Sequence, residues 1–273
     1  MGKILILGAN GLLGRALTLE LAAEEPIAWD KENLDLTDFE ELRCKIIDLW
    51  PEIIINASGY TAVDTAENNK EVAELMNGRV VDELARVAKE IGAVMVHFST
   101  DYVFDGEAEG GYDEDAIPSP INLYGRSKAL GEKLLLESGA RYYLIRSAWL
   151  FGDNGENFVK TILRVARDKG ELKVVNDQYG KPTYAKDLAR ATAELLRQKP
   201  EYGVYHLCNE GVTTWYDLAS RVVELMGIRA EVRPCASDEF PRAAKRPARA
   251  YLNNTRWQKL RPWQEALAEY LKV

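Results

Sequence analysis

The sequence predicts an α/β fold: a Rossmann-type, doubly wound parallel sheet with a smaller, mostly C-terminal α/β substrate-binding domain. Two observations lead to this prediction. Short apolar runs alternate with helical patterns up to about residue 150, as in parallel sheets covered by helices on both faces. The first apolar run ends in a glycine-rich turn, and beyond residue 150 the alternation becomes less regular.

Length and composition exclude several classes of protein. A chain of 273 residues with 47% hydrophobic residues can bury a sizeable core, so we exclude a disordered protein. A net charge of −8 argues against a nucleic-acid-binding protein, which normally carries a basic face. The apolar run at 4–7 is too short for a membrane span, and no cleavage site follows it. We therefore expect a soluble, cytoplasmic protein with neither a membrane nor a nucleic-acid partner.

The first strand, expected at 3–7, leads into a turn suited to phosphate binding. Gly8 allows a tight turn, Gly11 lets the backbone approach a pyrophosphate, and Gly14 lets the following helix pack close to the strand. The helix N-terminus adds free N–H groups and the positive end of a dipole. The spacing is G-x-x-G-x-x-G rather than the more usual G-x-G-x-x-G, and a tight turn without a ligand is the alternative interpretation.

Asp30 ends the second strand, which we expect at 26–29. An acidic residue about 20 positions after the glycine-rich turn can accept both ribose hydroxyls of an adenosine and repel a 2′-phosphate. This favours NADH as the cofactor. Lys31 stands beside Asp30 and could weaken that exclusion, so NADPH stays possible. The alternative role for Asp30 is a helix or turn cap.

The next elements complete the first half of the sheet. The sequence T-D-F-E has the spacing of a capping box and predicts a helix over 37–48. A strand is expected at 52–56, and the small residues at 57–59 would let a cofactor lie over the strand ends. One long amphipathic helix is expected at 70–91, because apolar residues recur there with helical spacing.

A fourth strand at 93–98 should deliver Ser99, Thr100 and Asp101 to the carboxyl edge of the sheet. Open α/β sheets bind their ligands at that edge. His97 lies inside the apolar run, and we interpret it as a hydrogen-bonded core residue rather than a catalytic one.

Tyr124 and Lys128 lie four residues apart and therefore share one face of an expected helix. An ammonium near a phenol favours the phenolate and would lower the pKa of Tyr124 from its usual value of about 10. Such a phenol can pass a proton to or from a substrate oxygen. Both residue types are common on helix surfaces, so the pair gains meaning only beside the glycine-rich turn and Thr100.

We assign 1–150 to a dinucleotide-binding domain, with 184–200 packing back onto it. The segments 151–183 and 201–273 are assigned to the substrate-binding domain. Within the C-terminal part we expect helices at 157–169, 185–197, 214–226 and 263–271, and strands at 172–175 and 204–207.

A basic segment at 241–261 stands out in this acidic chain. It contains Arg242, Lys245, Arg246, Arg249, Arg256 and Arg261. Such a segment could bind an anionic ligand such as a diphosphate. A solvated surface is the alternative interpretation.

Together these motifs resemble the extended short-chain dehydrogenase/reductase superfamily. The shared features, in the superfamily's order, are the glycine-rich turn, Asp30, Asn56-Ala57, Ser99-Thr100-Asp101 and Tyr124-x-x-x-Lys128. Within it, nearly the whole chain resembles the family of dTDP-4-dehydrorhamnose reductases. The narrower resemblance rests on S-T-D-Y-V-F-D-G at 99–106, Tyr-Gly at 124–125, N-D-Q-Y-G-x-P-T at 176–183 and Arg-Pro at 246–247.

The resemblance implies a reaction and a role for three residues. A hydride would pass from NAD(P)H to the C4 ketone of a nucleotide-linked 6-deoxyhexose, giving dTDP-L-rhamnose for cell-surface polysaccharide biosynthesis. Tyr124 would donate a proton to the C4 oxygen, and Thr100 would hydrogen-bond that oxygen. Lys128 would hold the cofactor ribose and lower the pKa of Tyr124.

The resemblance also implies two sets of contacts. Contacts to the cofactor would come from Gly8, Asn10, Gly11, Leu12, Leu13, Asp30, Asp35, Leu36, Ala57, Ser58, Tyr60, Tyr124 and Lys128. Contacts to the substrate would come from Thr100, Asp101, Tyr102, Trp149 and Arg246.

One feature departs from the family pattern. Some members bind magnesium at a dimer contact through glutamates, one of them in the first helix. Here that stretch reads Gly-Arg-Ala-Leu at 14–17 and has no carboxylate. Three widely spaced cysteines and two histidines also form no metal-binding motif. We therefore expect no metal, and both a monomer and a homodimer stay possible.

The residues that follow Thr100 distinguish between related enzyme activities. Sugar 4,6-dehydratases place Asp-Glu after this threonine as an acid and a base, whereas here Asp101-Tyr102 follows. This disfavours a dehydratase. A nucleotide-sugar 4-epimerase uses the same tyrosine and lysine and stays an alternative. An NAD-binding regulatory subunit resembling that of methionine adenosyltransferase is the other alternative, against which the intact Thr100, Tyr124 and Lys128 argue.

Overall fold

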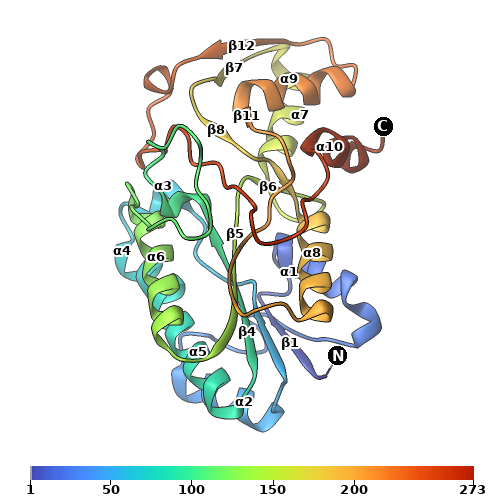
Figure 1. Ribbon diagram of the computed structural model, residues 1–273. Helices are drawn as coiled ribbons and strands as arrows, with labels where there is room; N and C mark the ends of the chain where they lie inside the picture. The colour runs from blue at the N-terminus through green and yellow to red at the C-terminus, as the bar shows by residue number, and fades with distance from the viewer. Residues whose placement is uncertain (1) are drawn as a thin grey trace.

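A six-stranded parallel sheet forms the centre of the larger part of the molecule (Figure 1). In the computed structural model, which describes residues 2–273, the strands lie in the order β2–β1–β3–β4–β5–β10. Their bounds are β1 (Ile4–Leu7), β2 (Ile27–Trp29), β3 (Ile53–Asn56), β4 (Val94–Thr100), β5 (Arg141–Ser147) and β10 (Gly203–His206). The chain passes from β1 outward to β2 and then returns to the other side of β1, so the order reverses between β1 and β3. This is the predicted doubly wound topology.

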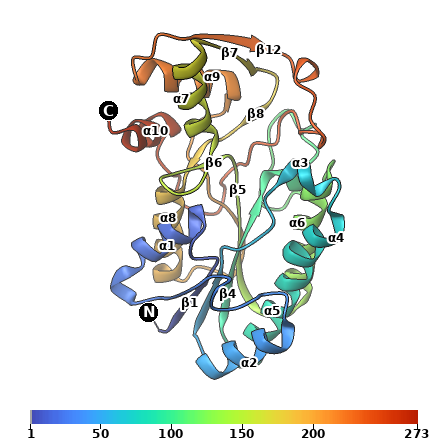
Figure 2. The same cartoon turned by 180° about the vertical axis from the view of Figure 1, so that it is seen from behind.

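Helices cover both faces of this sheet, which explains why β1 and β3 are buried at every position. On one face lie α1 (Leu12–Glu20) and α8 (Ala185–Gln198), which pack against each other. On the other lie α2 (Phe39–Leu49), α5 (Val80–Ile91) and α6 (Leu123–Glu137). Figure 2 shows the same two layers from behind.

The smaller part packs around its own apolar core beyond the carboxyl edge of the sheet (Figure 1). Its helices are α7 (Phe158–Lys169), α9 (Trp215–Leu225) and α10 (Trp263–Leu271). Its strand pairs are β6 (Leu150–Phe151) with β9 (Thr183–Tyr184), β7 (Glu171–Val175) with β12 (Glu231–Cys235), and β8 (Tyr179–Gly180) with β11 (Thr213–Thr214). The strand β12 was not predicted, because its charged residues and Pro234 hide the pattern of a strand.

The edge strand β10 requires a correction at one predicted boundary. We placed 201–273 in the smaller domain, yet residues 203–206 pair in parallel with β5 and extend the large sheet. Backbone groups along an open strand edge need hydrogen-bond partners, and β10 supplies them to β5. The rest of the two-domain assignment stays a prediction.

The helix expected at 70–91 is interrupted. It consists of α4 (Lys70–Glu74), a π-helical turn at Leu75–Arg79, and α5. The π-helical turn buries Asn77 and places Gly78 against Leu130 of α6, where a Cβ would lie 2.7 Å from the Leu130 Cδ2. Such turns are frequent at functional sites. Helical periodicity does not reveal the extra residue in the turn.

Two smaller features differ from the predictions. The helix α2 is capped by Asp38, which accepts from the Glu41 N–H at 3.0 Å, rather than by Thr37. The short helix α3 (Val63–Ala66) was not predicted. No helix among the described residues is long and apolar enough to span a membrane.

Candidate active site

A cleft of about 1140 Å³ opens at the carboxyl ends of β1, β3 and β4, where the strand order reverses. This is the place where open α/β sheets bind their ligands. Every residue that we expected to contact the cofactor lines it. The sequence analysis did not single out the wall residues Trp29, Met76, Asn77, Phe98 and Leu150.

The glycine-rich turn at the bottom of the cleft fits a diphosphate. Gly8 has a φ of +76°, and a Cβ there would lie 2.8 Å from the Ser58 nitrogen. A Cβ on Gly14 would lie 2.1 Å from the Gly8 carbonyl oxygen, so only glycine lets α1 approach β1 this closely. No side chain caps the N-terminus of α1, which leaves its first N–H groups available to an anion.

Asp30 has two roles in the geometry. It lines the cleft, and its Oδ2 also accepts from the Asn10 backbone N–H at 2.8 Å. The carboxylate thus fixes the glycine-rich turn. Asp30 therefore both lines the cleft and caps a backbone N–H of the turn, as the two interpretations from the sequence required. A second hollow of about 390 Å³ lies against Asp30 and is lined also by Arg15 and Asn33.

Tyr124 and Lys128 lie on the first turns of α6, which begins after Asn122. The Asn122 side chain accepts from the Gly125 N–H at 2.7 Å and caps the helix. A Cβ on Gly125 would lie 2.1 Å from the Tyr102 carbonyl oxygen, so glycine brings the helix close to the end of β4. This contact places Tyr124 beside Thr100, whose hydroxyl lies close enough to act on the pKa of the phenol.

The pKa of Tyr124 is raised, not lowered as we predicted. Burial disfavours the phenolate, and the Thr100 hydroxyl offsets this effect only in part. Lys128 directs its Nζ to the Phe98 carbonyl oxygen at 2.6 Å instead of stabilising the phenolate. Tyr124 is therefore a neutral phenol at neutral pH, the form that a proton donor needs.

Lys128 is itself perturbed by its surroundings. Its side chain is buried, and burial lowers its pKa to about 8, although Glu132 one turn further along α6 acts in the opposite direction. The ammonium can therefore lose its proton close to neutral pH.

Asp101 is a buried carboxyl next to the catalytic threonine candidate. Its Oδ1 accepts from the Thr100 hydroxyl at 2.9 Å, and its burial raises its pKa to about 7. This folded-state pKa exceeds the usual value of 3.8, so burying the ionised Asp101 carboxylate lowers the stability of the fold. The loss of stability is absent below about pH 4 and grows as the pH rises toward 7.

Asp101→Asn should remove that pH-dependent cost while keeping an oxygen that accepts from Thr100. We expect the variant to gain about 1–3 kcal/mol of stability over the wild type between pH 4 and pH 8. Urea unfolding of both proteins at several pH values measures the difference. A difference that does not change with pH would contradict the assigned burial effect.

Tyr102 lies next to Tyr124, and Arg246 lies next to Tyr102. The Tyr102 ring stands edge-on to the Tyr124 ring at 5.6 Å between centroids, and burial raises the pKa of Tyr102 to about 12. The Arg246 guanidinium hydrogen-bonds both carboxylate oxygens of Asp64 in α3, with Nη2–Oδ2 at 2.9 Å. Arg246 therefore ties the basic segment to α3.

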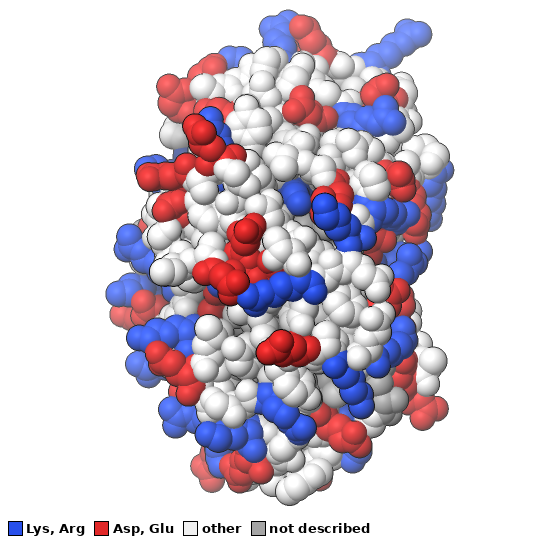
Figure 3. All heavy atoms as spheres, in the orientation of Figure 1, with Lys and Arg blue, Asp and Glu red and all other residues white. Residues whose placement is uncertain are grey.

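Two other members of the basic segment also form ion pairs within the protein. Arg256 pairs with Asp115, and Arg261 pairs with Asp187 at 2.8 Å. Figure 3 shows basic and acidic side chains interspersed over the face it presents. These pairs agree with a partly structural role for the segment.

Trp149 lies just past β5 with a φ of +47°. Its ring stacks on Trp215 of α9 with 3.5 Å between centroids, so it joins the smaller part to the carboxyl edge of the sheet. The motif at 176–183 lies beside it: a Cβ on Gly180 would lie 2.3 Å from the Trp149 ring. The predicted substrate residue is therefore held rigidly at the junction of the two parts.

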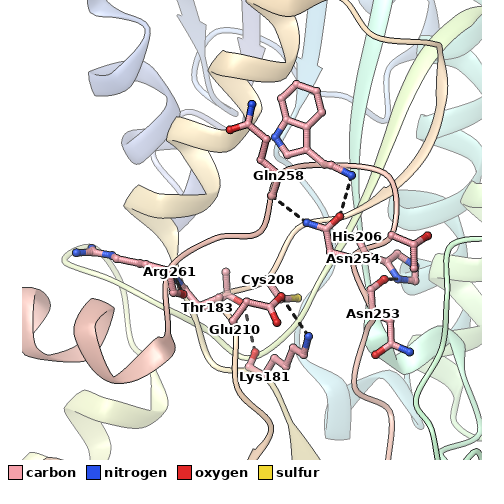
Figure 4. A network of polar contacts seen from close by, with 12 residues as sticks. Lys181, Thr183, His206, Cys208, Glu210, Asn253, Asn254, Gln258 and Arg261 are labelled. Carbon is pink, nitrogen blue, oxygen red and sulfur yellow. Dashed lines mark hydrogen bonds and ion pairs between the residues drawn. The ribbon is translucent and has the colours of Figure 1, made fainter.

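The same motif contributes a buried lysine. In Figure 4 Lys181 and Glu210 face each other near Thr183 and Cys208, with 3.5 Å between the lysine Nζ and the glutamate Oε1. Thr183 donates to the Lys181 carbonyl oxygen at 3.2 Å. Burial raises the pKa of Cys208 to about 11, so this thiol is not a nucleophile at neutral pH. The cluster fixes the loop on the strand end after β10.

Within residues 2–273 no three His, Cys, Asp or Glu side chains group in a way that could hold a metal ion. Among the predicted catalytic residues, Tyr124 and Lys128 line the cleft. The expected substrate residues are not among the residues that line it: Thr100, Asp101, Tyr102, Trp149 and Arg246.

The fold and this site define a member of the extended short-chain dehydrogenase/reductase superfamily. The chain belongs to the dTDP-4-dehydrorhamnose reductase family, as predicted: the family model described as the RmlD substrate binding domain matches residues 2–273.

Three known proteins illustrate the relationship. The dTDP-4-dehydrorhamnose reductase of Escherichia coli is 38% identical over 98% of this chain and 97% of its own length. The spore coat polysaccharide biosynthesis protein SpsK of Bacillus subtilis is 38% identical over 100% of this chain and 98% of its own. The crystal structure of a dTDP-4-dehydrorhamnose reductase from Bacillus anthracis in complex with NADP has a TM-score of 0.96, at 35% identity over 99% of both chains.

Proposed function

We propose that this chain reduces the C4 ketone of dTDP-4-dehydro-L-rhamnose to dTDP-L-rhamnose with NAD(P)H, in the synthesis of cell-surface polysaccharide. One observation carries the proposal: Tyr124 and Lys128 line the same cleft as the expected cofactor residues, and Thr100 lies beside Tyr124. The names of the relatives support both the reaction and its place in polysaccharide synthesis.

The dinucleotide, when bound, supplies a hydride to the C4 carbon. Tyr124 donates its phenolic proton to the C4 oxygen as the negative charge develops there, since its raised pKa keeps it protonated beforehand. Thr100 lies beside the phenol and would hydrogen-bond the same C4 oxygen. Lys128 carries a positive charge below about pH 8 and would hold the cofactor ribose beside Tyr124.

Residues around Tyr124 would contact the sugar and the diphosphate of the substrate. Tyr102 and Trp149 would form apolar walls for the sugar. Asp101 is buried and accepts from Thr100, so it would act on the substrate through the Thr100 hydroxyl. Arg246 would reach the diphosphate only with part of its guanidinium, since Asp64 already occupies two of its donors. No resident metal is proposed.

The direct test mixes purified protein with dTDP-4-dehydro-L-rhamnose and NADH or NADPH and follows the absorbance of the reduced nicotinamide. We expect oxidation of the cofactor and formation of dTDP-L-rhamnose. No oxidation with either cofactor would rule out the reductase function. A panel of other nucleotide 4-ketosugars would then define the base and the sugar that the site accepts.

We propose that NADH is favoured and NADPH is also accepted. Asp30 disfavours a 2′-phosphate by charge. Arg15 lines the hollow on the other side of Asp30 and offers a positive charge to the same group. The relative from Bacillus anthracis was solved with NADP, which supports this tolerance.

Asp30→Ala should reduce the preference for NADH over NADPH by about 10-fold or more, because the repulsion of the 2′-phosphate is lost. The variant should also bind both cofactors more weakly, since the Asn10 N–H loses its acceptor. Steady-state kcat/KM values for both cofactors measure the ratio. An unchanged ratio would mean that Asp30 serves only to fix the glycine-rich turn.

A further inference from the structure

A histidine that the proposed mechanism does not use lies behind Lys128. His97 is on β4 and is fully buried, and its Nε2 lies 3.4 Å from the Lys128 Nζ. Its other ring nitrogen, Nδ1, lies 3.2 Å from the side-chain nitrogen of Asn56 on the neighbouring strand β3. The charged and titratable groups that face Lys128 are His97 from β4 and Tyr124 and Glu132 from α6.

The orientation of the Asn56 amide is fixed by Ser58. The backbone N–H of Ser58 can only donate, and it points to the Asn56 Oδ1 at 3.1 Å. The Ser58 hydroxyl donates to the same oxygen at 2.5 Å. The other end of the amide, which faces His97, must therefore be the NH₂ group.

The amide orientation determines the histidine tautomer. Because Asn56 donates to His97 Nδ1, that nitrogen carries no proton. A neutral imidazole then carries its proton on Nε2, and this N–H faces Lys128. His97 is neutral, since burial and the charge of Lys128 lower its pKa well below the ordinary value. An N–H group facing an ammonium repels it, whereas it donates to a neutral amine.

We propose that Asn56 and His97 are positioning residues for Lys128: they hold a histidine N–H against its Nζ and so make the ammonium give up its proton more readily. The His97 N–H and the burial of Lys128 both favour the neutral amine over the ammonium. Its kinetic consequence rests on the proposed reductase function, whereas the tautomer itself does not. The arrangement connects the cleft residue Ser58 to Lys128 through the two strands between them.

The tautomer can be measured on the intact wild-type protein. The chain has two histidines, so ¹⁵N-histidine labelling gives few ring signals, and the His97→Asn variant assigns those of His97 by losing them. We expect a neutral ring with the proton on Nε2 from pH 6 to pH 8. A proton on Nδ1, or a charged ring, would overturn the proposal whether or not the protein is a reductase.

Kinetics test the effect on Lys128. Activity that requires the Lys128 ammonium should fall as the pH rises through about 8. In His97→Asn the facing N–H is gone, and in Asn56→Asp the carboxylate should draw the proton to Nδ1, so that Nε2 accepts from Lys128. We expect both variants to move the alkaline limb of kcat/KM upward by about one pH unit.

The result that would overturn this effect is an alkaline limb that stays within about 0.2 pH units of the wild type in both variants while kcat falls. That result would give His97 a purely structural role. Absence of turnover in the wild type would instead refute the proposed function and leave the NMR measurement to decide the tautomer.

Discussion

Replacing Tyr124 by phenylalanine should lower kcat by about 10²–10⁴-fold, because the substitution removes the proton donor and little else. The ring would keep its edge-on contact with Tyr102 and its packing in the small apolar cluster with Ala66 and Ala73. Burial keeps the wild-type phenol neutral and ready to donate. Single-turnover oxidation of NADH at saturating substrate measures the chemical step directly.

The affinity for the dinucleotide should change little in Tyr124→Phe, because the glycine-rich turn and Asp30 are untouched. Tyr202→Phe is a matched control: the same hydroxyl is removed from a tyrosine that is 43% exposed and remote from the cleft. We expect that variant to keep wild-type kcat. Substantial activity in Tyr124→Phe would show that another group protonates the product.

Glu132→Ala should lower the free energy of unfolding by about 3–5 kcal/mol, because it leaves the Arg146 guanidinium buried without its counter-ion. The two side chains are each 3% exposed. Arg146 Nη2 donates to Glu132 Oε2 at 2.6 Å and Nε donates to Oε1 at 3.0 Å. The pair joins α6 to β5 behind the proposed catalytic residues.

Urea unfolding of Glu132→Ala and of the wild type measures the loss. Glu224→Ala is the control, since Glu224 pairs with Arg221 at 2.7 Å on the surface, where its side chain is 68% exposed. We expect the control to lose less than about 0.5 kcal/mol. Equal losses in the two variants would mean that burial does not determine the strength of the Arg146–Glu132 pair.

Much of the cofactor cleft follows from short motifs, because its parts follow one another in fixed order along the chain. The glycine-rich turn predicts where β1 ends and α1 begins, and the expected cofactor residues all line the cleft. The proposed substrate side was harder to predict from the residues themselves. It would combine Tyr102, Trp149 and the segment around Arg246, which come from three separate parts of the chain.

The errors share a cause. The edge strand β10 was assigned to the wrong part because a four-residue apolar run does not indicate which sheet it joins. The π-helical turn at Leu75–Arg79 was missed because local periodicity does not show the hydrogen bonds of Asn77, which accepts from the Tyr60 N–H and donates to the Ser127 hydroxyl. Both features depend on partners that lie far away in the sequence.

The sequence alone determined the family, the nucleotide-binding turn, and the spacing that puts Tyr124 and Lys128 on one face of a helix. Only the tertiary structure decided the proton affinities of that pair. It buries the phenol so that its pKa rises, and it aims the lysine at the Phe98 carbonyl oxygen with His97 beside it. The physical reason is that spacing along a helix is local, whereas a proton affinity depends on the desolvation and dipoles that distant strands bring to the site.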